Sequence, residues 1–478
     1  MQWFTAPEYW LARQVLQRGI AAIYLIAFVA AARQFRALIG ERGMLPVPRY
    51  LARTPFRAAP SIFQLHYSDR FFALACWVGA LLSAALLAGG GDLAPLWAGM
   101  LVWLLIWVLY LSIVNVGQTW YSFGWESLLL EAGFLVMFLG NDDIAPPVLV
   151  LWLARWLVFR VEFGAGLIKI RGDSCWRTLT CLYYHHETQP IPGPLSWYFH
   201  HLPKPLHRIE AAGNHVAQLV VPFLLFAPQP VAAAAGVVVV VTQLWLVLSG
   251  NFAWLNWVTI VLACSAIPDR FVGVASPSLP DPPVWFVCVV VAFTAAVVVL
   301  SYRPVRNLLS HRQRMNASFN RYHLVNTYGA FGVVGRTRDE VVIEGTADTR
   351  LTEHTVWLEY EFKGKPGDVH RRPPQIAPYH LRLDWLMWFV AISPAYARDW
   401  LPAFLRLLLD NDAETVRLLR RNPFPDSAPQ YVRARLYRYR FSSWHELRHE
   451  HIWWHRTLLG EYIPPVARRA PHGQTTGG

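Results

Sequence analysis

The sequence is poor in charged residues and in cysteine for its length. Only 15% of its 478 residues are Asp, Glu, Lys or Arg, whereas soluble proteins contain about 25%. Hydrophobic residues make up 54% of the chain, which excludes intrinsic disorder for most of it. Five cysteines form too few disulfides to stabilise a chain of this length, so a disulfide-dense secreted scaffold is excluded too. The composition favours a protein whose solvent is partly lipid.

Lysine is scarce, although the chain is basic. The formal net charge is +12, and the only lysines are Lys169, Lys204, Lys363 and Lys365. Basic residues alternate with long apolar runs, so membrane headgroups are the expected counter-charge and nucleic acid is not an expected partner. The excess of Arg over Lys, together with abundant Ala and Val, is typical of a high-GC bacterial genome.

Long apolar runs fill the first two thirds of the chain. A helix that spans lipid needs about 17–25 mainly apolar residues, because its backbone polar groups must be satisfied internally. The sequence predicts nine such helices, in a multi-pass α-helical membrane bundle at residues 1–302. The predicted spans are 16–35, 71–90, 94–115, 123–140, 148–170, 215–227, 231–249, 252–267 and 284–302.

The composition changes after residue 302. Residues 303–465 are rich in Arg, Asp, Glu and Pro and contain no run long enough to span a membrane. We expect them to form a C-terminal extramembrane α+β domain, followed by a flexible tail at 466–478. The elements expected in this domain are strands at 341–344, 356–362 and 431–441 and a helix at 414–421.

Two long connections, 36–70 and 171–214, are predicted to lie on the same face of the membrane as the C-terminal domain. Function is expected on this elaborate face, because binding and catalytic residues concentrate in loops. The basic stretch 36–57 would place that face in the cytoplasm by the positive-inside tendency.

Charged residues interrupt the fourth and fifth predicted spans. Arg155, Glu162 and Lys169 are spaced at i, i+7 and i+14, so they lie on one stripe of a helix. Charges inside a bilayer avoid lipid and mark either structural ion pairs or functional sites. One interpretation is an ion-pair network that joins the two spans, and the other is a proton relay with Lys169 as base. The members of this network are Glu126, Glu131, Arg155, Arg160, Glu162 and Lys169.

Cys175 and Cys181 lie in the second long connection and are six positions apart. They are close enough to form a disulfide if this face meets an oxidising compartment. The same connection is rich in His, but none of its His spacings is a recognised metal-ligand pattern. Its aromatic residues favour a belt at the level of the lipid headgroups.

One motif matches zinc proteases in form. His445, Glu446 and His449 spell H-E-x-x-H, and His455 stands where metzincins place a third ligand. Metzincins need Gly at the position of Ile452, because the chain turns there. These residues are therefore only weak candidates, and no metal or cofactor is predicted.

Several longer strings resemble the lipase maturation factor family. The resemblance runs in order through nearly the whole chain, from residue 10 to residue 465. The strings are YSFGWES at 121–127, GAGLIKIRGD at 164–173, HETQP at 186–190, SGN at 249–251, LNW at 255–257, NTYGAFG at 326–332, KPGD at 365–368, PYH at 378–380, RLDWLMWF at 382–389, NPF at 422–424 and WW at 453–454.

The resemblance implies a multi-pass membrane protein of the secretory pathway. In animals the family lies in the endoplasmic reticulum membrane and assists the folding of secreted lipases, with the C-terminal domain in the lumen. A bacterial member would lie in the plasma membrane with this domain outside the cytoplasm, contrary to the charge rule. The implied motif surface consists of Arg171, Asp173, His186, Glu187, Tyr328, Asp368, His380, Asp384 and Trp385.

The leading functional hypothesis is a non-enzymatic maturation factor that binds membrane lipids and a secreted client, in the first place a lipase. Such a protein needs apolar and aromatic surface, which Trp385, Trp388 and Trp400 would supply unless they form the domain core. Deletion of 303–478 is then expected to leave an inserted but inactive bundle. An alternative is a membrane-embedded enzyme, because the bundle distantly resembles the vitamin K-dependent carboxylase superfamily and Lys169 would be the base. A membrane-tethered zinc protease is the third hypothesis.

Overall fold

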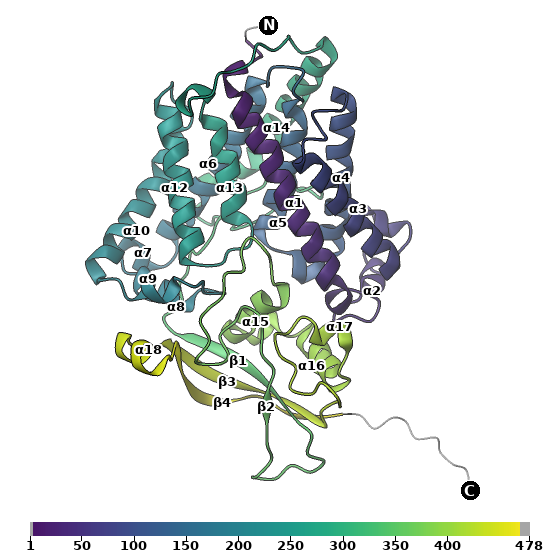
Figure 1. The fold of residues 1–478 in the computed structure, drawn as a ribbon, viewed down its shortest axis with the longest axis vertical. Coiled ribbons are helices and arrows are strands. Elements are labelled where there is room, and N and C mark those ends of the chain that lie inside the picture. Colours follow the sequence, from purple (N-terminus) through teal and green to yellow (C-terminus); the bar gives the residue numbers. More distant parts are fainter. Residues whose placement is uncertain (1–2, 469–478) are drawn as a thin grey trace.

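A computed structural model describes residues 3–468 and shows a helical bundle with a sheet-containing domain at one end (Figure 1). The N-terminus lies at the opposite end of the bundle. The longer bundle helices are α1 (Trp10–Leu38), α3 (Asp69–Leu87), α4 (Leu96–Val116), α5 (Gly124–Val136), α6 (Val148–Arg171), α10 (Lys204–Leu219), α12 (Val231–Ser249), α13 (Leu255–Ala263) and α14 (Val284–Leu309). The short ones are α2 (Val47–Leu51), α7 (Ser174–Arg177), α8 (Leu182–Thr188), α9 (Ser196–His200) and α11 (Val221–Leu224).

Five helical segments within the described residues are long and apolar enough to cross a membrane. Their exposed side chains are largely apolar, as in Val298 and Val299 of α14, which are 65% and 73% exposed. Such side chains suit a surrounding of lipid rather than water. The five segments are Pro7–Leu38, Asp69–Leu87, Leu96–Val116, Val231–Ser249 and Val284–Leu309.

The prediction of nine spans is not confirmed, for reasons of length and charge. α5 has 13 residues and α13 has nine, which at about 1.5 Å per residue is less than the hydrocarbon thickness. α6 has 24 residues but carries the charges Arg155, Arg160, Glu162 and Lys169. The sixth predicted span is divided, because α10 ends at Leu219 and the short α11 follows.

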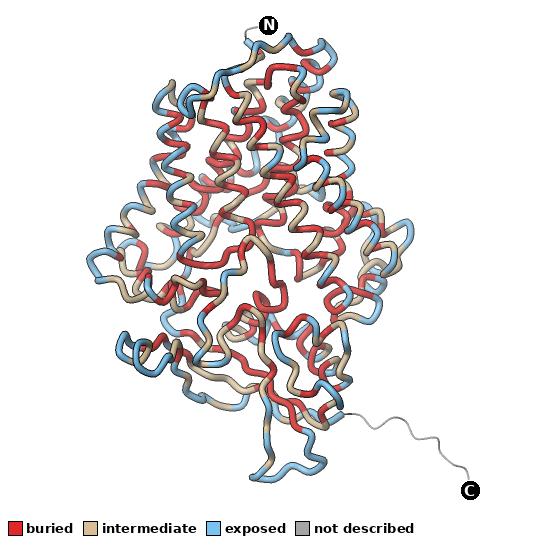
Figure 2. Tube along the Cα trace, in the orientation of Figure 1, coloured by how far each residue is buried: buried red, intermediate tan, exposed pale blue. Residues whose placement is uncertain are grey.

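Helix α1 contacts α3, α5 and α13 and forms the centre of the bundle. Tyr24 and Phe28 of α1 pack edge-on against Tyr110 of α4, with ring centroids 5.5 and 5.3 Å away. Gly133 of α5 permits the close approach of α1, since a Cβ there would clash with the hydroxyl of Tyr24. Buried residues continue from this centre towards the C-terminal domain (Figure 2).

The C-terminal domain contains a four-stranded sheet in the order β2-β1-β3-β4, in which all neighbours are antiparallel. Helices α15 and α16 lie between the sheet and the bundle (Figure 1). The strands are β1 (Arg338–Thr346), β2 (Leu358–Glu359), β3 (Tyr431–Phe441) and β4 (Trp454–Ala467). The helices are α15 (Arg382–Ile392), α16 (Leu401–Leu409), α17 (Ala413–Val416) and α18 (Trp444–Glu450).

Several boundaries differ from those expected. The helix expected at 414–421 is the four-residue α17, which ends at Val416, and the strand expected at 341–344 is extended on both sides in β1. α14 continues to Leu309, seven residues beyond the predicted end of the bundle at 302. β2 is a two-residue strand inside the predicted strand 356–362. β4 was not predicted and extends to Ala467, so it includes the first residues of the predicted tail. Residues 469–478 of that tail lie outside the described residues.

The two long connections lie at the end of the bundle that faces the C-terminal domain. The first contains α2, and the second contains α7, α8 and α9 (Figure 1). Trp197 of α9 is fully buried and donates a hydrogen bond to the carbonyl of Ser442, 3.0 Å away. The C-terminal domain is therefore attached to the second connection by buried contacts as well as by the chain.

Candidate functional site

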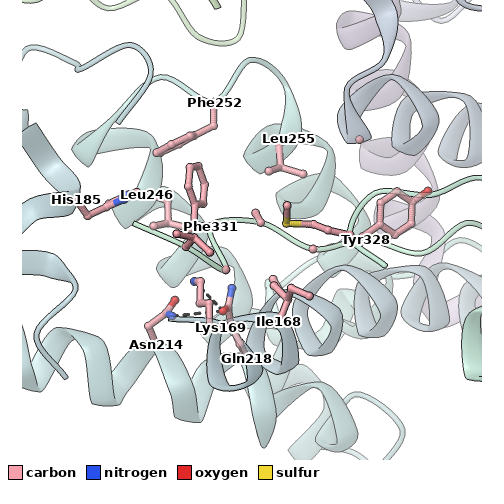
Figure 3. A pocket seen from close by; sticks show the side chains of 18 of the residues that line it. Ile168, Lys169, His185, Asn214, Gln218, Leu246, Phe252, Leu255, Tyr328 and Phe331 are labelled. Carbon is pink, nitrogen blue, oxygen red and sulfur yellow. Dashed lines mark hydrogen bonds between the residues drawn. The ribbon is translucent and has the colours of Figure 1, made fainter. Parts of the chain in front are cut away.

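A cavity of about 1210 Å³ lies where the bundle meets the C-terminal domain. Its walls come from α6, α8, α10, α12 and α15 and from the segment that follows α14. Most of the lining is apolar, and Figure 3 shows Ile168, Leu246, Phe252, Leu255 and Phe331 around it. No sequence pattern predicted this cavity, because its walls come from segments far apart in the chain.

Polar side chains gather on the bundle side of the cavity. The Nζ of Lys169 donates to the Oε1 of Gln218 at 2.9 Å, and the Nδ2 of Asn214 donates to the same oxygen at 3.3 Å (Figure 3). Glu162 also lines the cavity and accepts a hydrogen bond from the amide of Gln243. The cavity thus combines apolar walls with a few charged side chains, among them Lys169 and the carboxylates of Glu162 and Glu210, which suits an amphipathic or largely apolar occupant.

The three residues of the predicted stripe on α6 form hydrogen bonds to residues of other segments. The Nη2 of Arg155 donates to the carbonyl of Ser265 and to the hydroxyl of Tyr9, both at 3.0 Å. Among residues 3–468, no ion pair within 4.0 Å joins Glu162 to Lys169. The stripe therefore does not act as a single chain of ion pairs.

The carboxylates of α5 bind the C-terminal part of the chain. Glu126 is fully buried and receives a hydrogen bond from the Nη1 of Arg382 at 2.5 Å. The carboxylate also accepts from the hydroxyl of Tyr110, and the Nδ1 of His380 lies 3.6 Å away. The guanidinium of Arg382 stacks over the ring of Tyr121 at 3.5 Å. This buried pair connects the bundle directly to the start of α15.

Glu131 makes the second connection of this kind. It pairs with Arg160 of α6 and accepts from the backbone NH of Asn326 at 2.9 Å and the hydroxyl of Tyr328 at 2.8 Å. The pair Glu131–Arg160 joins the fourth and fifth predicted spans, as one interpretation of the network expected. The role of Arg382 and Asn326 was missed, because neither lies in an apolar run.

The residues predicted as a motif surface are largely buried. His186, Tyr328, His380, Asp384 and Trp385 are each at most 4% exposed. They are buried because they connect parts of the molecule to one another. The Oδ1 of Asp384 accepts from the backbone NH of Gly364 at 2.6 Å, and the ring of Trp385 lies 4.7 Å from that of Trp125.

The remaining motif residues lie on connecting segments. Asp173 caps α7 and receives a hydrogen bond from the Nη2 of Arg336 at 2.8 Å, which lowers the pKa of its carboxyl. Arg171 donates to the carbonyl of Leu308 at 2.9 Å.

Glu187 accepts from the backbone NH of Phe441, while burial raises the pKa of its carboxyl. Asp368 is exposed and accepts from the backbone NH of His370. Of the tryptophans expected on a surface, Trp400 is 1% exposed and belongs to the core, whereas Trp385 and Trp388 line the cavity.

Cys175 and Cys181 are joined in a disulfide next to α7 and α8. Both are buried, and they pack with Trp176 and with Val334 from the segment that leads into β1. The disulfide thus lies at the end of the bundle that carries the C-terminal domain.

The H-E-x-x-H motif forms α18, but its residues serve other purposes. Glu446 completes a capping box with Ser443, and its carboxylate lies 2.9 Å from the Nε2 of His455. The hydrogen bond from His455 lowers the pKa of Glu446 to about 2, so this carboxylate is a weak base. Neither group of metal-ligand type found within residues 3–468 includes His445 or His449.

Comparison with known proteins covers both parts of the chain. Residues 11–274 match the family model of the lipase maturation factor transmembrane domain, and residues 324–464 match that of the lipase maturation factor C-terminal domain. Lipase maturation factor 1 of Bos taurus is 42% identical over 514 residues, which cover 98% of this chain and 91% of that protein. The human protein of the same name is 41% identical over 501 residues, which cover 96% of this chain and 88% of that protein.

Lipase maturation factor 2 of Xenopus laevis is more distant, at 29% identity over 96% of this chain and 83% of that protein. No solved structure matches the chain. These relatives are animal proteins and give no support to the bacterial origin suggested by the composition. Because both domains match over nearly the whole length, the chain is an integral membrane protein that belongs to the lipase maturation factor family.

Proposed function

We propose that this protein assists the maturation of secreted lipases, or of other exported proteins, by holding an apolar segment of the client in the cavity between its two parts. The observation that carries this proposal is the size and lining of that cavity. At about 1210 Å³ it exceeds the pockets of about 300–1,000 Å³ that hold small ligands. A partly folded lipase exposes apolar segments of this kind, and their burial is favourable.

The rim of the cavity offers an entrance for such a segment. Ile209 and Ile392, which line it, are 66% and 58% exposed, and they come from α10 of the bundle and α15 of the C-terminal domain. Leu206 and Tyr396 add further exposed apolar surface at the same cavity. A client bound here would contact both parts of the protein.

Gly213 provides a test of the cavity. It lines the cavity from α10, and a Cβ added there would meet no atom within 4 Å. Gly213→Phe should therefore occupy the cavity without a backbone clash and reduce the lipase activity that cells secrete when this chain is their only maturation factor. Gly213→Ala is the matched control and should retain activity, because Ala favours a helix over Gly. Equal lipase secretion with both variants would contradict a role for the cavity.

We further propose that the C-terminal domain lies outside the cytoplasm, where exported clients fold. The disulfide between Cys175 and Cys181 supports a location outside the cytoplasm, since disulfides persist in oxidising compartments. Protease added to sealed vesicles with the extracytoplasmic face outward should cleave within the loop between β1 and β2. Protection of that loop until the vesicles are opened would place the domain in the cytoplasm.

A second candidate function is a membrane-embedded enzyme that uses Lys169 as base. The observation in its favour is that Lys169 lines the cavity and has one hydrogen-bond acceptor, Gln218, besides its contact with the ring of Trp176 at 4.8 Å. Lys169→Met should then abolish lipase maturation without loss of thermal stability. Full activity of this variant would leave only the non-enzymatic function.

A further inference from the structure

Three side chains of metal-ligand type meet where α8 contacts α10. His186 lies on α8, while His207 and Glu210 are one turn apart on α10 and so share a helix face. One ligand atom from each of the three lies within 4.8 Å of those of the other two. The three residues are brought together from separate helices, which explains why spacing in the sequence did not indicate them.

Several polar atoms of this cluster lack hydrogen-bond partners within the described residues. Both ring nitrogens of His186, the Nδ1 of His207 and the Oε2 of Glu210 are buried and unpaired within residues 3–468. His186 and His207 are only 1% and 2% exposed, so water does not reach them freely. Buried polar atoms without partners are costly, and four of them in one place call for a common partner.

Other atoms of His207 and Glu210 take part in hydrogen bonds, and the Oε1 of Glu210 also lies 3.9 Å from the Nε2 of His186. The Nε2 of His207 lies 3.3 Å from the carbonyl of His200, which fixes the tautomer that leaves Nδ1 free as a ligand. The Nε1 of Trp245 donates to the Oε1 of Glu210 at 2.8 Å and so orients this carboxylate. Supporting contacts of this kind are typical of metal ligands.

We propose that His186, His207 and Glu210 bind a divalent transition-metal ion. Two imidazoles and one carboxylate are a donor set that suits Zn²⁺, which in sites with three protein ligands keeps one position open. His186 and Glu210 also line the large cavity, so the open position faces it. The ion connects α8 to α10 and gives the cavity a site for a carboxylate or carbonyl oxygen of its occupant.

The second group of possible ligands does not compete with this assignment. It consists of Asp173, Cys175 and Cys181, and its two sulfur atoms are joined in a disulfide. A disulfide sulfur is no thiolate and does not bind Zn²⁺ in the manner of a cysteine ligand.

The test is the metal content of the full-length protein, purified in detergent after dialysis against a defined concentration of Zn²⁺. About one tightly bound Zn²⁺ per chain is expected. Glu210→Gln keeps the shape of the side chain and the acceptor for Trp245 but removes the charge, and His207→Ala removes a ligand. Loss of a supporting contact alone costs about 10- to 100-fold in metal affinity, so loss of a ligand should cost at least as much.

The matched control is the double variant His445→Gln and His449→Gln, which removes the two histidines of the H-E-x-x-H motif. It should bind Zn²⁺ as the wild type does. Loss of the metal in this control, or unchanged binding in Glu210→Gln, would overturn the assignment, and so would a wild-type protein that binds no Zn²⁺. Titration of the wild type with Co²⁺ gives a second readout that requires no variant to fold. Visible absorption bands of a tetrahedral site are expected, and their absence would count against the site.

Discussion

At the scale of single residues, the molecule depends on charges that are buried and paired across its two parts. Arg382 and Glu126 are both fully buried, and each has the other as its nearest opposite charge. A buried ion pair adds little net stability compared with an apolar pair, but removal of one partner leaves the other charge uncompensated. The pair therefore makes the bundle and the C-terminal domain dependent on each other.

Arg382→Met should lower the free energy of unfolding by about 3–5 kcal/mol, since it leaves Glu126 buried without its cation. Thermal and denaturant unfolding of the purified protein in detergent measures this loss. Addition of Glu126→Gln to the same chain should restore part of it. Arg417→Met is the control, because the Arg417 side chain is 69% exposed in its pair with Glu414 and should contribute less than about 1 kcal/mol. Equal losses in both Arg variants would contradict the role of burial.

Acid should destabilise the protein through His380, which is fully buried, and His323, which is half-buried. Burial lowers the pKa of His380 to about 4, with the charge of Arg382 acting in the same direction, and burial lowers the pKa of His323 to about 4. The unfolded chain binds protons below pH 6.5 that the folded chain does not bind, so stability is complete above pH 6.5 and is lost as the pH falls towards 4. Each histidine should cost on the order of 2 kcal/mol between pH 8 and pH 5. Thermal unfolding at several pH values measures this slope, which should be shallower in His323→Gln; an unchanged slope would exclude His323 as a cause.

The sequence could reveal that these residues matter but not what they contact. Charges within apolar runs identified Glu126, Glu131 and Arg160 as members of a network. The partner of Glu126 is 256 residues away in the chain, and no local pattern marks Arg382 as a buried cation. The cluster of His186 with His207 and Glu210 was missed for the same reason.

At the scale of elements, the alternation of apolar and polar residues predicted a strand that has one buried face, but it did not predict a strand that is mostly exposed. β3 was predicted with its bounds because apolar and polar residues alternate along it. β4 contains Pro464 and Pro465, which are unusual within strands, and it is mostly exposed. Its sequence therefore lacks the alternation of apolar and polar residues that indicates a half-buried strand. Proline is tolerated there because β4 is an edge strand.

Removal of β4 should unfold the C-terminal domain despite its exposure. Its first residue, Trp454, is 1% exposed and stacks on Phe441 of β3 with ring centroids 4.1 Å apart. Truncation after residue 453 should make the region from β1 to β3 sensitive to protease, as limited proteolysis of membranes can show. Truncation after Arg468 keeps β4 and is the matched control. Equal resistance of the two chains would show that β3 does not need its neighbour.

At the scale of the whole molecule, the bundle and the C-terminal part share buried contacts. The structure buries residues from the C-terminal part against α5, so a bundle that ends at Leu309 loses the partners of Glu126 and some of those of Glu131. We therefore add to the expectation of an inserted but inactive bundle that the bundle alone is less stable.

A chain of residues 1–309 should insert into membranes but aggregate or unfold at lower temperature than the full-length protein. Size-exclusion chromatography and thermal unfolding in detergent measure both effects. Glu126→Gln in the short chain should improve its recovery, because it removes the uncompensated charge, whereas the same change in the full-length chain should be destabilising. A monodisperse short bundle as stable as the full-length protein would show that the two parts fold separately.

The pair between Arg382 and Glu126 also has a consequence for synthesis. The 256 residues between them take roughly 13–50 s to translate at about 5–20 residues per second. During that interval α5 is already made, while Arg382 has not yet been translated or has not yet left the ribosome. The nascent protein thus spends much of its production time with Glu126 already made and the cation that neutralises it not yet present.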